Sequence, residues 1–352
     1  MEFGVTVKKR VNDYFKSNNI SRLGDYRIWI KVFVLPLTFI GPFILLVTNS
    51  FMDNMFLFYG LWLIMGIGIA GSGLGVMHDA FHGALSKNKK VNHFIGSLIM
   101  SMAGGAVINW KIQHNVLHHT YPNIDKYDDD IDVTGLLKLS PNQPMKPVFK
   151  YQAYYAWFLY GFMTLSWATF KDFKQLLKYE KQGLIKKQGT TYKTELRKLV
   201  ALKIIYLFTF IVLPLLAIDV AWWHSILGWF SMHFVAGLTL GCVFLPAHVV
   251  PTSDFPKPNN SNVIANDYFV HQLRTTSNFA PSKRIFSWYV GGLNYQIEHH
   301  LFPTMSHVHH KKVSKIVKAT AKEYGLPYNS QPTFIGAIIN HAKMLKKMSA
   351  IS

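Results

Sequence analysis

The chain has 352 residues, of which 50% are hydrophobic and 15% aromatic, and its formal net charge is +19. This hydrophobic content excludes an ordinary soluble domain and predicts an integral membrane protein. The single cysteine, Cys242, excludes an intrachain disulfide, a four-cysteine iron–sulfur site and a zinc ribbon, and we expect it to be an inert small hydrophobe.

Residues 1–31 are polar and basic, so they do not read as a signal peptide. Four apolar stretches are long enough to cross a bilayer. They cover residues 32–48, 55–76, 199–218 and 226–246. Lys203 lies near the start of the third stretch, where we expect it to snorkel to the interface. Short turns near 49–54 and 219–225 predict two helical hairpins.

The basic residues predict which segments face the cytoplasm. All 37 Lys and Arg except Lys203 lie in the N-terminal segment, in 77–198 or after Pro246. The positive-inside rule therefore places both termini and the segments 77–198 and 247–352 on the cytoplasmic side. The same rule accounts for the basic balance, so we expect no nucleic-acid partner.

The uncharged stretch 151–170 is also long enough to span. A span there would place the lysine-rich segment 171–198 outside, against the charge rule, so we predict an interfacial or re-entrant helix. A fifth span is the alternative. The predicted fold is thus an all-α integral membrane protein in one domain, 1–352. It has four transmembrane helices in two hairpins, interfacial helices and a cytoplasmic cap.

Three histidine clusters lie in the segments predicted to be cytoplasmic. They are His78-Asp-Ala-Phe-His82, His114-Asn-Val-Leu-His118-His119 and Gln296-Ile-Glu-His299-His300. In the first two, the i, i+4 spacing places two rings on one face of a helix. Imidazole nitrogen is a ligand of iron, copper and zinc. The cytoplasmic cap is therefore expected to hold a metal site built from all three clusters.

The number of candidate ligands favours two metals over one. His248 ends the fourth predicted span, and Gln296 offers an amide oxygen. Together with the clustered histidines these groups exceed the four ligands of a tetrahedral zinc site. Two redox metals can activate O₂, which zinc cannot do, and iron is the natural expectation for oxygen chemistry with nitrogen ligands.

Several polar residues near the clusters are candidates for the shell of hydrogen-bond partners that orients metal ligands. They are Asp79, Asn115 and Glu298. His271 fits equally well as such a partner or metal ligand and as a structural residue. The acidic run Asp128-Asp129-Asp130, with Asp132, is a further candidate, and it is equally compatible with a solvated loop or with a helix cap.

Other histidines have simpler interpretations. His93, His224 and His341 are predicted to be polar tips at the membrane interface, and His307, His309 and His310 to be solvated in a basic stretch. His233 lies inside the fourth predicted span, where we expect a hydrogen bond to a neighbouring helix.

The three clusters resemble the histidine boxes of the membrane fatty acid desaturase family, over residues 78 to about 303. The resemblance implies a non-haem di-iron centre that uses O₂ to insert a cis double bond. The third box begins with Gln296 and continues into Leu-Phe-Pro, which is similar to front-end (delta-6- or delta-5-like) desaturases. Many of those enzymes carry a fused cytochrome b5 domain, which 1–31 is too short to hold. The resemblance therefore implies an external electron donor, either ferredoxin or cytochrome b5 with its reductase.

The resemblance also implies a fatty acyl substrate, carried on CoA or on a lipid, within a long apolar tunnel. Trp110, Trp157 and Tyr295 are candidate wall residues, although packing is the default for each. Lys111 and Arg274 are candidates for a headgroup phosphate, with ordinary cytoplasmic charge as the alternative.

Two other functions remain open. The first is a related di-iron hydroxylase or ketolase of alkyl or isoprenoid chains, which product analysis would distinguish. The second is a membrane haem protein or metal carrier. Haem needs one or two axial ligands and would leave most of these histidines without a role.

Overall fold

The computed structural model describes residues 2–51, 54–132, 135–261 and 263–350. Its first third contains α1 (Glu2–Ser17), α2 (Tyr26–Val47), α3 (Met55–Ser72), η1 (Gly73–Met77), α4 (His78–Phe81), α5 (Lys89–Met102), α6 (Val107–Trp110) and η2 (Lys111–His118). Its middle contains η3 (Pro147–Tyr151), α7 (Gln152–Gly161), α8 (Met163–Ser166), η4 (Trp167–Lys171), α9 (Asp172–Lys181), α10 (Leu184–Lys187), α11 (Tyr192–Leu207), η5 (Phe208–Val212), α12 (Leu213–Ala217) and α13 (Trp222–His248).

The C-terminal part contains α14 (Tyr268–Thr275), β1 (Asn278–Phe279), α15 (Arg284–Tyr289), α16 (Gln296–Leu301), η6 (His307–His309), α17 (His310–Glu323), β2 (Ser330–Gln331) and α18 (Phe334–Ser349). The strands β1 and β2 pair in parallel over two residues each. Of the η elements, η1, η2, η4 and η5 are π-helical turns, whereas η3 and η6 are 3₁₀ turns.

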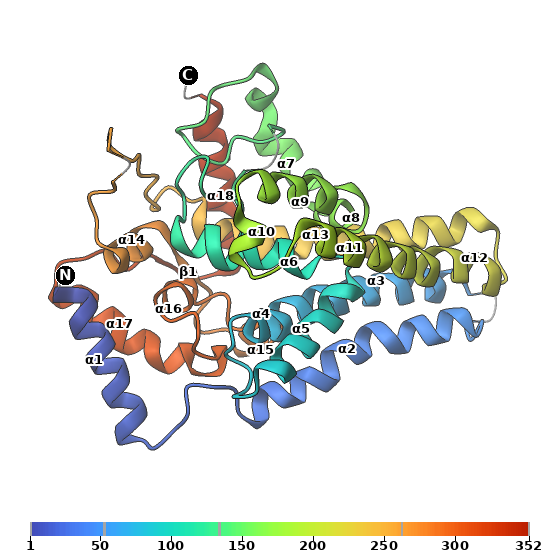
Figure 1. Cartoon of the computed structure of the whole chain (residues 1–352), viewed down its shortest axis with the longest axis horizontal. Coiled ribbons are helices and arrows are strands. Elements are labelled where there is room, and N and C mark those ends of the chain that lie inside the picture. The colour runs from blue at the N-terminus through green and yellow to red at the C-terminus, as the bar shows by residue number, and fades with distance from the viewer. Residues whose placement is uncertain (1, 52–53, 133–134, 262, 351–352) are drawn as a thin grey trace.

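Among the residues that the structure describes, four helical segments are long and apolar enough to cross a membrane, as the sequence predicts. They are Tyr26–Val47, Met55–Phe81, Tyr192–Ala217 and Trp222–His248. They extend together toward one end of the molecule, away from α1 and α17 (Figure 1). At that end the Asn49 side chain donates to the Ala217 carbonyl and accepts from the Asp219 amide, at 2.9 and 2.8 Å. The turns after α2 and α12 are thereby tied together.

The segments between the second and third spans differ from the sequence prediction in one respect. Lys89–Met102 and Val107–His118 form a helix pair bent by 108°, which is apolar enough to be a broken span or a re-entrant loop. The sequence did not predict this bend. The oily stretch 151–170 is divided among η3, α7, α8 and η4 and is not among the helices that could span.

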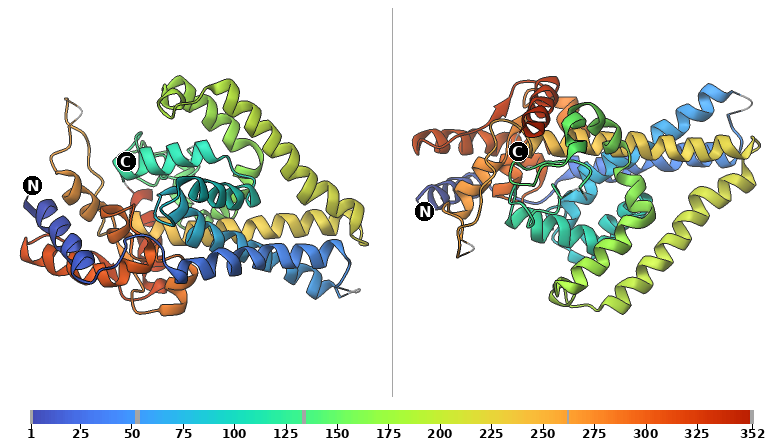
Figure 2. Two further views of the ribbon diagram at one scale, coloured as in Figure 1. Left: turned by 60° about the horizontal axis from the view of Figure 1, so that its bottom comes forward. Right: turned by 90° about the horizontal axis from the view of Figure 1, so that it is seen from above.

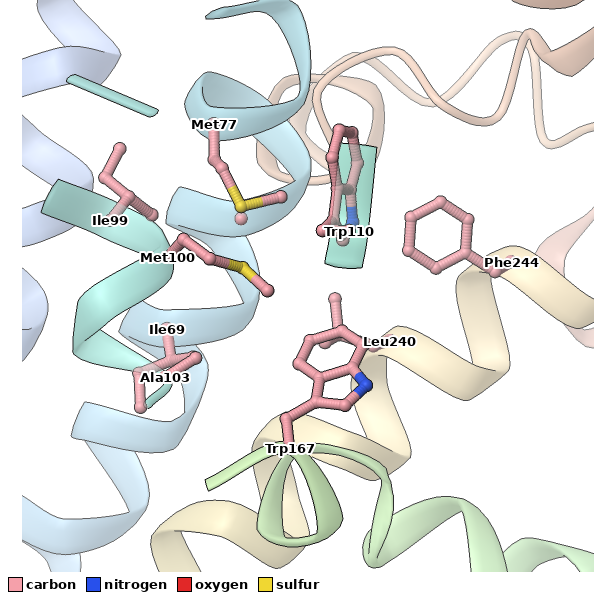
Figure 3. Close-up of a pocket in the computed structure, with 10 residues that line it drawn as sticks. Ile69, Met77, Ile99, Met100, Ala103, Trp110, Trp167, Leu240 and Phe244 are labelled. Atoms are coloured by element: carbon pink, nitrogen blue, oxygen red, sulfur yellow. The ribbon is translucent and has the colours of Figure 1, made fainter. Parts of the chain in front are cut away.

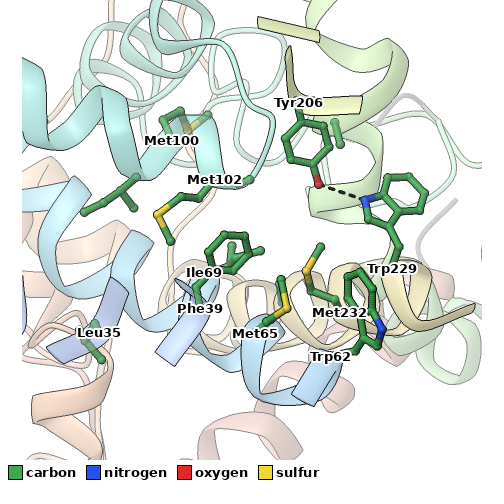
Figure 4. Packing of buried hydrophobic residues seen from close by; sticks show 14 of the residues in the cluster. Leu35, Phe39, Trp62, Met65, Ile69, Met100, Met102, Tyr206, Trp229 and Met232 are labelled. Atoms are coloured by element: carbon green, nitrogen blue, oxygen red, sulfur yellow. Dashed lines mark hydrogen bonds between the residues drawn. The ribbon is translucent and has the colours of Figure 1, made fainter. Parts of the chain in front are cut away.

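The helices α2, α3 and α13 pack closely around an apolar core. A Cβ at Gly66 of α3 would lie 2.4 Å from the Met232 carbonyl of α13, so glycine is needed for this approach. Figure 4 shows part of the core, in which Phe39, Met65 and Met232 from three helices meet. Such interdigitation of side chains fixes how the helices sit against one another.

Two polar groups are buried beside this core. His233 of α13 bonds the Tyr206 hydroxyl at 2.6 Å and the Thr164 hydroxyl at 3.0 Å, which confirms the predicted bond to a neighbouring helix. Lys203, which we expected to snorkel, is 5% exposed instead. Its ammonium group pairs with Asp172 at 2.7 Å. This carboxylate compensates the positive charge of the buried lysine.

The first helix, α1, packs against α17 from the C-terminal part of the chain. Phe3, Val7, Val11 and Phe15 recur every fourth residue, and all are buried on the face of α1 that packs against α17. The two helices lie side by side in Figures 1 and 2, with α14 and α16 next to them. The third histidine box lies on α16, which thereby contacts α14 and α17.

Candidate metal centre

The first histidine box begins with the short helix α4, which follows α3 through the π-turn η1. His78 is buried, and its ring centroid lies 4.6 Å from that of His82, as the i, i+4 spacing predicts. The Nε2 atom of His78 lies 3.0 Å from Nε2 of His114 in the second box. The first two boxes therefore meet through their ring nitrogens.

The second box is π-helical rather than α-helical, because η2 covers Lys111–His118. The wider turn brings three histidines to one side, and π-turns of this kind are frequent at functional sites. The ring of His114 lies 5.2 Å from that of His118 and 4.9 Å from that of His119. The sequence spacing predicted the shared face but not the type of helix.

Two members of the acidic run lie directly behind the second box. Asp128 accepts from Nδ1 of His118, and Asp130 accepts from Nδ1 of His114, each at 2.9 Å. These bonds fix a proton on Nδ1 of each ring and direct the Nε2 atoms toward the other boxes. The sequence did not single out either carboxylate, although its signal is an acidic run that closely follows the second box.

The third box occupies the short helix α16. The Nε2 atom of His299 lies 3.0 Å from Nε2 of His119, and Nδ1 of His300 donates to the Gln272 side chain at 2.8 Å. Gln296 is 1% exposed, and its Oε1 atom has no hydrogen-bond partner among the described residues.

His248 joins the boxes from the end of α13. Its Nδ1 atom donates to the Thr275 carbonyl at 3.2 Å, and its ring lies 4.6 Å from that of His118 and 4.8 Å from that of His300. The Nε2 atoms of His248, His300 and His82 are buried and lack partners among the described residues. Buried polar atoms without partners are costly unless a cation occupies the space between them.

The ligand atoms form overlapping groups. The first comprises His78, His82, His114 and His299, and the second comprises His118, His248 and His300. A third joins His119 to His299 and His300, and a fourth joins His114 and His118 to Asp130. Within each group the ligand atoms lie within 4.8 Å of one another. Two nitrogens that share one metal lie roughly 4 Å apart or less, given bond lengths of about 2.1 Å. Because ring nitrogens converge at nearly this spacing, the donor set fits two metal ions.

The charge states of the rings agree with this interpretation. Burial lowers the pKa of His119, His299 and His300, so these rings are neutral and able to act as ligands near pH 7. Burial also lowers the pKa of His118, but Asp128 and Asp130 outweigh it and raise that pKa to about 9. A metal bound at Nε2 would therefore replace a proton that the two carboxylates stabilise.

The polar residues that we predicted behind the ligands have other partners. Asp79 accepts from Ser306 and His307, Asn115 donates to the Phe81 carbonyl, and the Glu298 carboxylate accepts from Asn278 and Tyr328. Burial raises the pKa of Glu298 to about 7. His271 is buried but stands outside the groups of ligand atoms. Their influence on a metal stays a prediction.

The prediction that His307, His309 and His310 are solvated is wrong. Their exposed fractions are 7%, 5% and 1%, because η6 and the start of α17 fold back against the boxes. His307 lies between Asp79 at 2.9 Å and Lys31 at 2.7 Å, so it links the first box to α2. The polar, basic sequence around these histidines concealed their burial.

The three histidines that we expected at the interface have different surroundings. His93 is exposed, and His224 is half-buried with a bond to the Tyr59 hydroxyl at 2.7 Å. His341 is fully buried, which contradicts the prediction. Its ring joins the Tyr160 hydroxyl at 2.7 Å to the Val249 carbonyl at 2.8 Å, because α18 packs over α7 and α13.

A cavity of about 260 Å³ opens beside the second group of histidines. Its polar part includes Gln113, Asp130 and Lys171 as well as His114, His118 and His248, and its apolar part includes Leu159, Tyr160, Phe162 and Met163. Lys111 and Arg274 do not line it. Lys111 lies over the Phe81 ring, and Arg274 pairs with Asp254 at 3.2 Å.

A smaller cavity of about 30 Å³ lies next to the larger one. The two share Trp110, Trp167 and Phe244 in their linings. Figure 3 shows these aromatic rings facing a pocket that Met77 and Met100 close on the other side. Trp110 thus lines both cavities as predicted, whereas Trp157 packs against His341 and Tyr295 bonds the Pro281 carbonyl.

Comparison with known proteins identifies the family. A model described as fatty acid desaturase matches residues 54–332. A sn-1 linoleoyl-lipid 6-desaturase of Arthrospira platensis is 31% identical over 347 residues, which cover 99% of this chain and 92% of the relative. The enzyme of the same name from Synechocystis sp. is 29% identical, with 99% and 96% covered. An acyl-lipid (8-3)-desaturase of Physcomitrium patens is 31% identical, with 99% and 72% covered.

The boxes, the four apolar helices and these matches agree with one another. The chain is an oxidoreductase that acts on fatty acyl chains, and it belongs to the fatty acid desaturase family.

Proposed function

We propose that the chain is a front-end acyl desaturase, which inserts a cis double bond between an existing double bond and the carboxyl end of the acyl chain. The observation that carries this proposal is the pair of converging histidine groups beside an apolar cavity. The names of the relatives, linoleoyl-lipid 6-desaturase and acyl-lipid (8-3)-desaturase, support a front-end reaction on an acyl lipid. An acyl-CoA substrate is the alternative carrier.

The two groups of ligands would each hold one iron ion. His78, His82, His114 and His299 would hold the first, and His118, His248 and His300 the second. His119 would bind beside them, and Gln296 would offer its buried amide oxygen. When bound, the iron pair supplies the activation of O₂ and the oxidising power for attack on an unactivated methylene.

The protein's own residues fix the ligands and balance their charge. Asp128 and Asp130 hold the Nδ1–H groups of His118 and His114, so that each Nε2 atom faces the metal. The Gln272 side chain and the Thr275 carbonyl do the same for His300 and His248. The rings would thereby be oriented, with the two carboxylates beside them, before any metal binds.

The cavities would position the acyl chain. The carboxyl end and its carrier would lie at the polar part near Gln113 and Lys171, and the chain would pass His114 and His118. Trp110 and Trp167 would then direct it toward the smaller apolar cavity and exclude water. With the carboxyl end of the acyl chain this close to the histidines, the methylenes near that end would be the ones to react. This placement favours reaction on the carboxyl side of an existing double bond.

The reaction needs electrons from outside the chain. Two hydrogen atoms leave neighbouring methylenes, and two further electrons and two protons reduce O₂ completely to water. We propose that ferredoxin, or cytochrome b5 with its reductase, delivers these electrons on the cytoplasmic side. In this arrangement 1–352 is one domain with two helical hairpins in the membrane, and both termini, 77–198 and 247–352 are cytoplasmic.

The test is the fatty acid profile of cells that express the chain and receive linoleate or saturated acids. We expect a new double bond on the carboxyl side of an existing one, located by mass spectrometry, and its loss in His118→Ala and His299→Ala. Hydroxylated products would replace the proposal with the related hydroxylase. An unchanged profile from iron-loaded protein with a competent reductant would refute the front-end assignment.

A further inference from the structure

One side of α17 carries a row of exposed lysines, which we call the lysine face. Their spacing of i, i+4, i+7 and i+11 places them on a single side of the helix. They are Lys311, Lys315, Lys318 and Lys322. The apolar side of α17 is buried in the cluster that it shares with α1.

The positive charge of the lysine face is not balanced within the fold. Among the described residues, no ion pair involves these four lysines. Glu323, the acidic residue of α17, pairs with Arg10 of α1 at 2.6 Å. Like charges at i, i+4 disfavour a helix, so the row reduces the stability of α17.

Membrane orientation does not require the lysines of α17. The positive-inside rule acts on basic residues within roughly 15–20 residues of a membrane span. The last apolar segment ends at His248, whereas α17 begins only at His310. The lysine face therefore needs another explanation.

The lysine face begins close to the candidate metal centre. Lys311 directly follows His310, whose ring centroid lies 6.1 Å from that of the candidate ligand His299. Just before α17, His307 bonds Asp79 of the first box at 2.9 Å. Because the rate of electron transfer falls steeply with distance, a redox protein bound at the start of α17 would be well placed to reduce the centre.

A soluble protein fits this face better than a lipid surface does. The apolar segments extend toward the end of the molecule that lies away from α17 (Figure 1). A helix that lies in a lipid surface buries large apolar side chains there. The exposed side of α17 carries lysines, Ala319 and Glu323, whereas Val313 and Val317 are buried in the cluster with α1. An acidic protein surface would complement this charge.

We propose that the lysine face of α17 is the docking surface of the electron donor, a small one-electron carrier whose redox group is surrounded by carboxylates. This inference rests on the proposed function, which needs two electrons from outside the chain. The carrier gives up one electron per encounter and leaves oxidised, so two encounters supply one turnover. Exposed charge pairs speed such encounters without holding the complex tightly.

The first test removes three charges from the lysine face. The α17 variant carries Lys311→Gln, Lys315→Gln and Lys322→Gln. The control is an α18 variant with the exposed lysines changed as Lys343→Gln, Lys346→Gln and Lys347→Gln. The iron-loaded full chain receives electrons from a reduced [2Fe–2S] ferredoxin or from the soluble haem domain of cytochrome b5, each chosen for an acidic surface.

At low ionic strength we expect the KM for the protein donor to rise about tenfold in the α17 variant alone. Turnover with reduced methyl viologen, a small chemical donor, should stay at the wild-type rate in both variants. An unchanged KM in the α17 variant, or an equal rise in the α18 variant, would overturn the proposal.

A second test needs no turnover. A carbodiimide joins carboxylates of the donor to the lysines that they touch, and mass spectrometry identifies those lysines. We expect cross-links to α17 that disappear at high salt. Cross-links confined to other lysines, or an effect of the α17 variant only in nanodiscs of anionic lipid, would contradict a docking role. Wild-type protein that desaturates with none of these donors would refute the proposed function instead, since the cross-links would still report docking.

Discussion

Individual residues show which parts of the site could be predicted from local sequence. The spacing of the clustered histidines predicted that they share a site, and the structure brings all three clusters together with His248. The hydrogen bonds of Asp128 and Asp130 to the ligands could not be predicted, because an acidic run has the same sequence in a solvated loop as behind a metal ligand. His307 and His310 were misjudged because their neighbours in sequence are basic, while their burial comes from segments far away in the chain.

The role of Asp128 can be tested against another aspartate of the same acidic segment. In Asp128→Asn the amide accepts a weaker hydrogen bond from His118 Nδ1, so the ring loses basicity and orientation. We expect the affinity for iron to fall about 10- to 100-fold, measured by metal content after dialysis. Asp132→Asn is the control, since Asp132 is half exposed and pairs with Lys178. Equal losses in both variants would contradict a specific role of Asp128.

The buried ring of His341 should make the stability of the folded protein depend on pH. Burial lowers its pKa from 6.5 to about 4, while its bond to the Val249 carbonyl opposes this. The folded state therefore binds fewer protons than the unfolded state between these pH values. Its contribution to stability is complete above pH 6.5 and is lost as the pH falls toward about 4.

The measurement is thermal unfolding in detergent across this pH range. His341→Gln should remove part of the acid destabilisation, on the order of 3 kcal/mol at most. Lys343→Gln on the exposed side of the same helix should keep the wild-type slope. Parallel curves for His341→Gln and the wild type would show that this ring does not titrate as proposed.

Amino-acid composition predicts where the long apolar helices lie, whereas the local shape of other helical segments depends on tertiary packing. The four long apolar helices agree with the predicted spans, because apolar stretches this long have few alternatives. The π-turns η1 and η2 and the 108° bend were not foreseen, since they arise where helices must accommodate the boxes and one another. Hydrophobic periodicity carries no signal for such local widening.

The turn between α15 and α16 offers a test of how the third box is positioned. Gly291 has φ +61°, and a Cβ there would lie 2.3 Å from the Leu74 carbonyl beside the first box. Gly291→Ala must therefore displace backbone, and we expect a loss of several kcal/mol in stability and release of iron. Gly189 has φ +73° with open space around it, so Gly189→Ala should cost only about 1 to 2 kcal/mol. Similar unfolding temperatures and iron contents in both variants would contradict this account.

For the molecule as a whole, the proposed orientation makes a direct prediction. In a Cys242→Ala background, we expect Ser50→Cys, at the end tied by Asn49, to react with an impermeant thiol reagent only from outside the cell. Lys343→Cys, which is exposed in the cap, should react only after the cells are opened. Labelling of Lys343→Cys in intact cells would place the histidine boxes on the wrong side for a cytoplasmic electron donor.

The cavities connect the fold to the length of the acyl chain that it accepts. Ala103 lines the small cavity beyond Trp110, where the methyl end of the chain would lie. Ala103→Phe should fill this space and shift the products toward shorter acyl chains, with iron content unchanged because Ala103 is not among the residues that offer ligand atoms. Overpacking would also cost about 1 to 3 kcal/mol of stability.

Leu98 provides the matched control for this substitution. It lies on α5, which ends directly before Ala103, and it is 53% exposed, so Leu98→Phe adds an aromatic ring without entering the cavity. Its products should match those of the wild type. If Ala103→Phe also leaves the chain-length profile unchanged, the acyl chain does not end in the small cavity, and the larger cavity beside His118 must hold it in another direction.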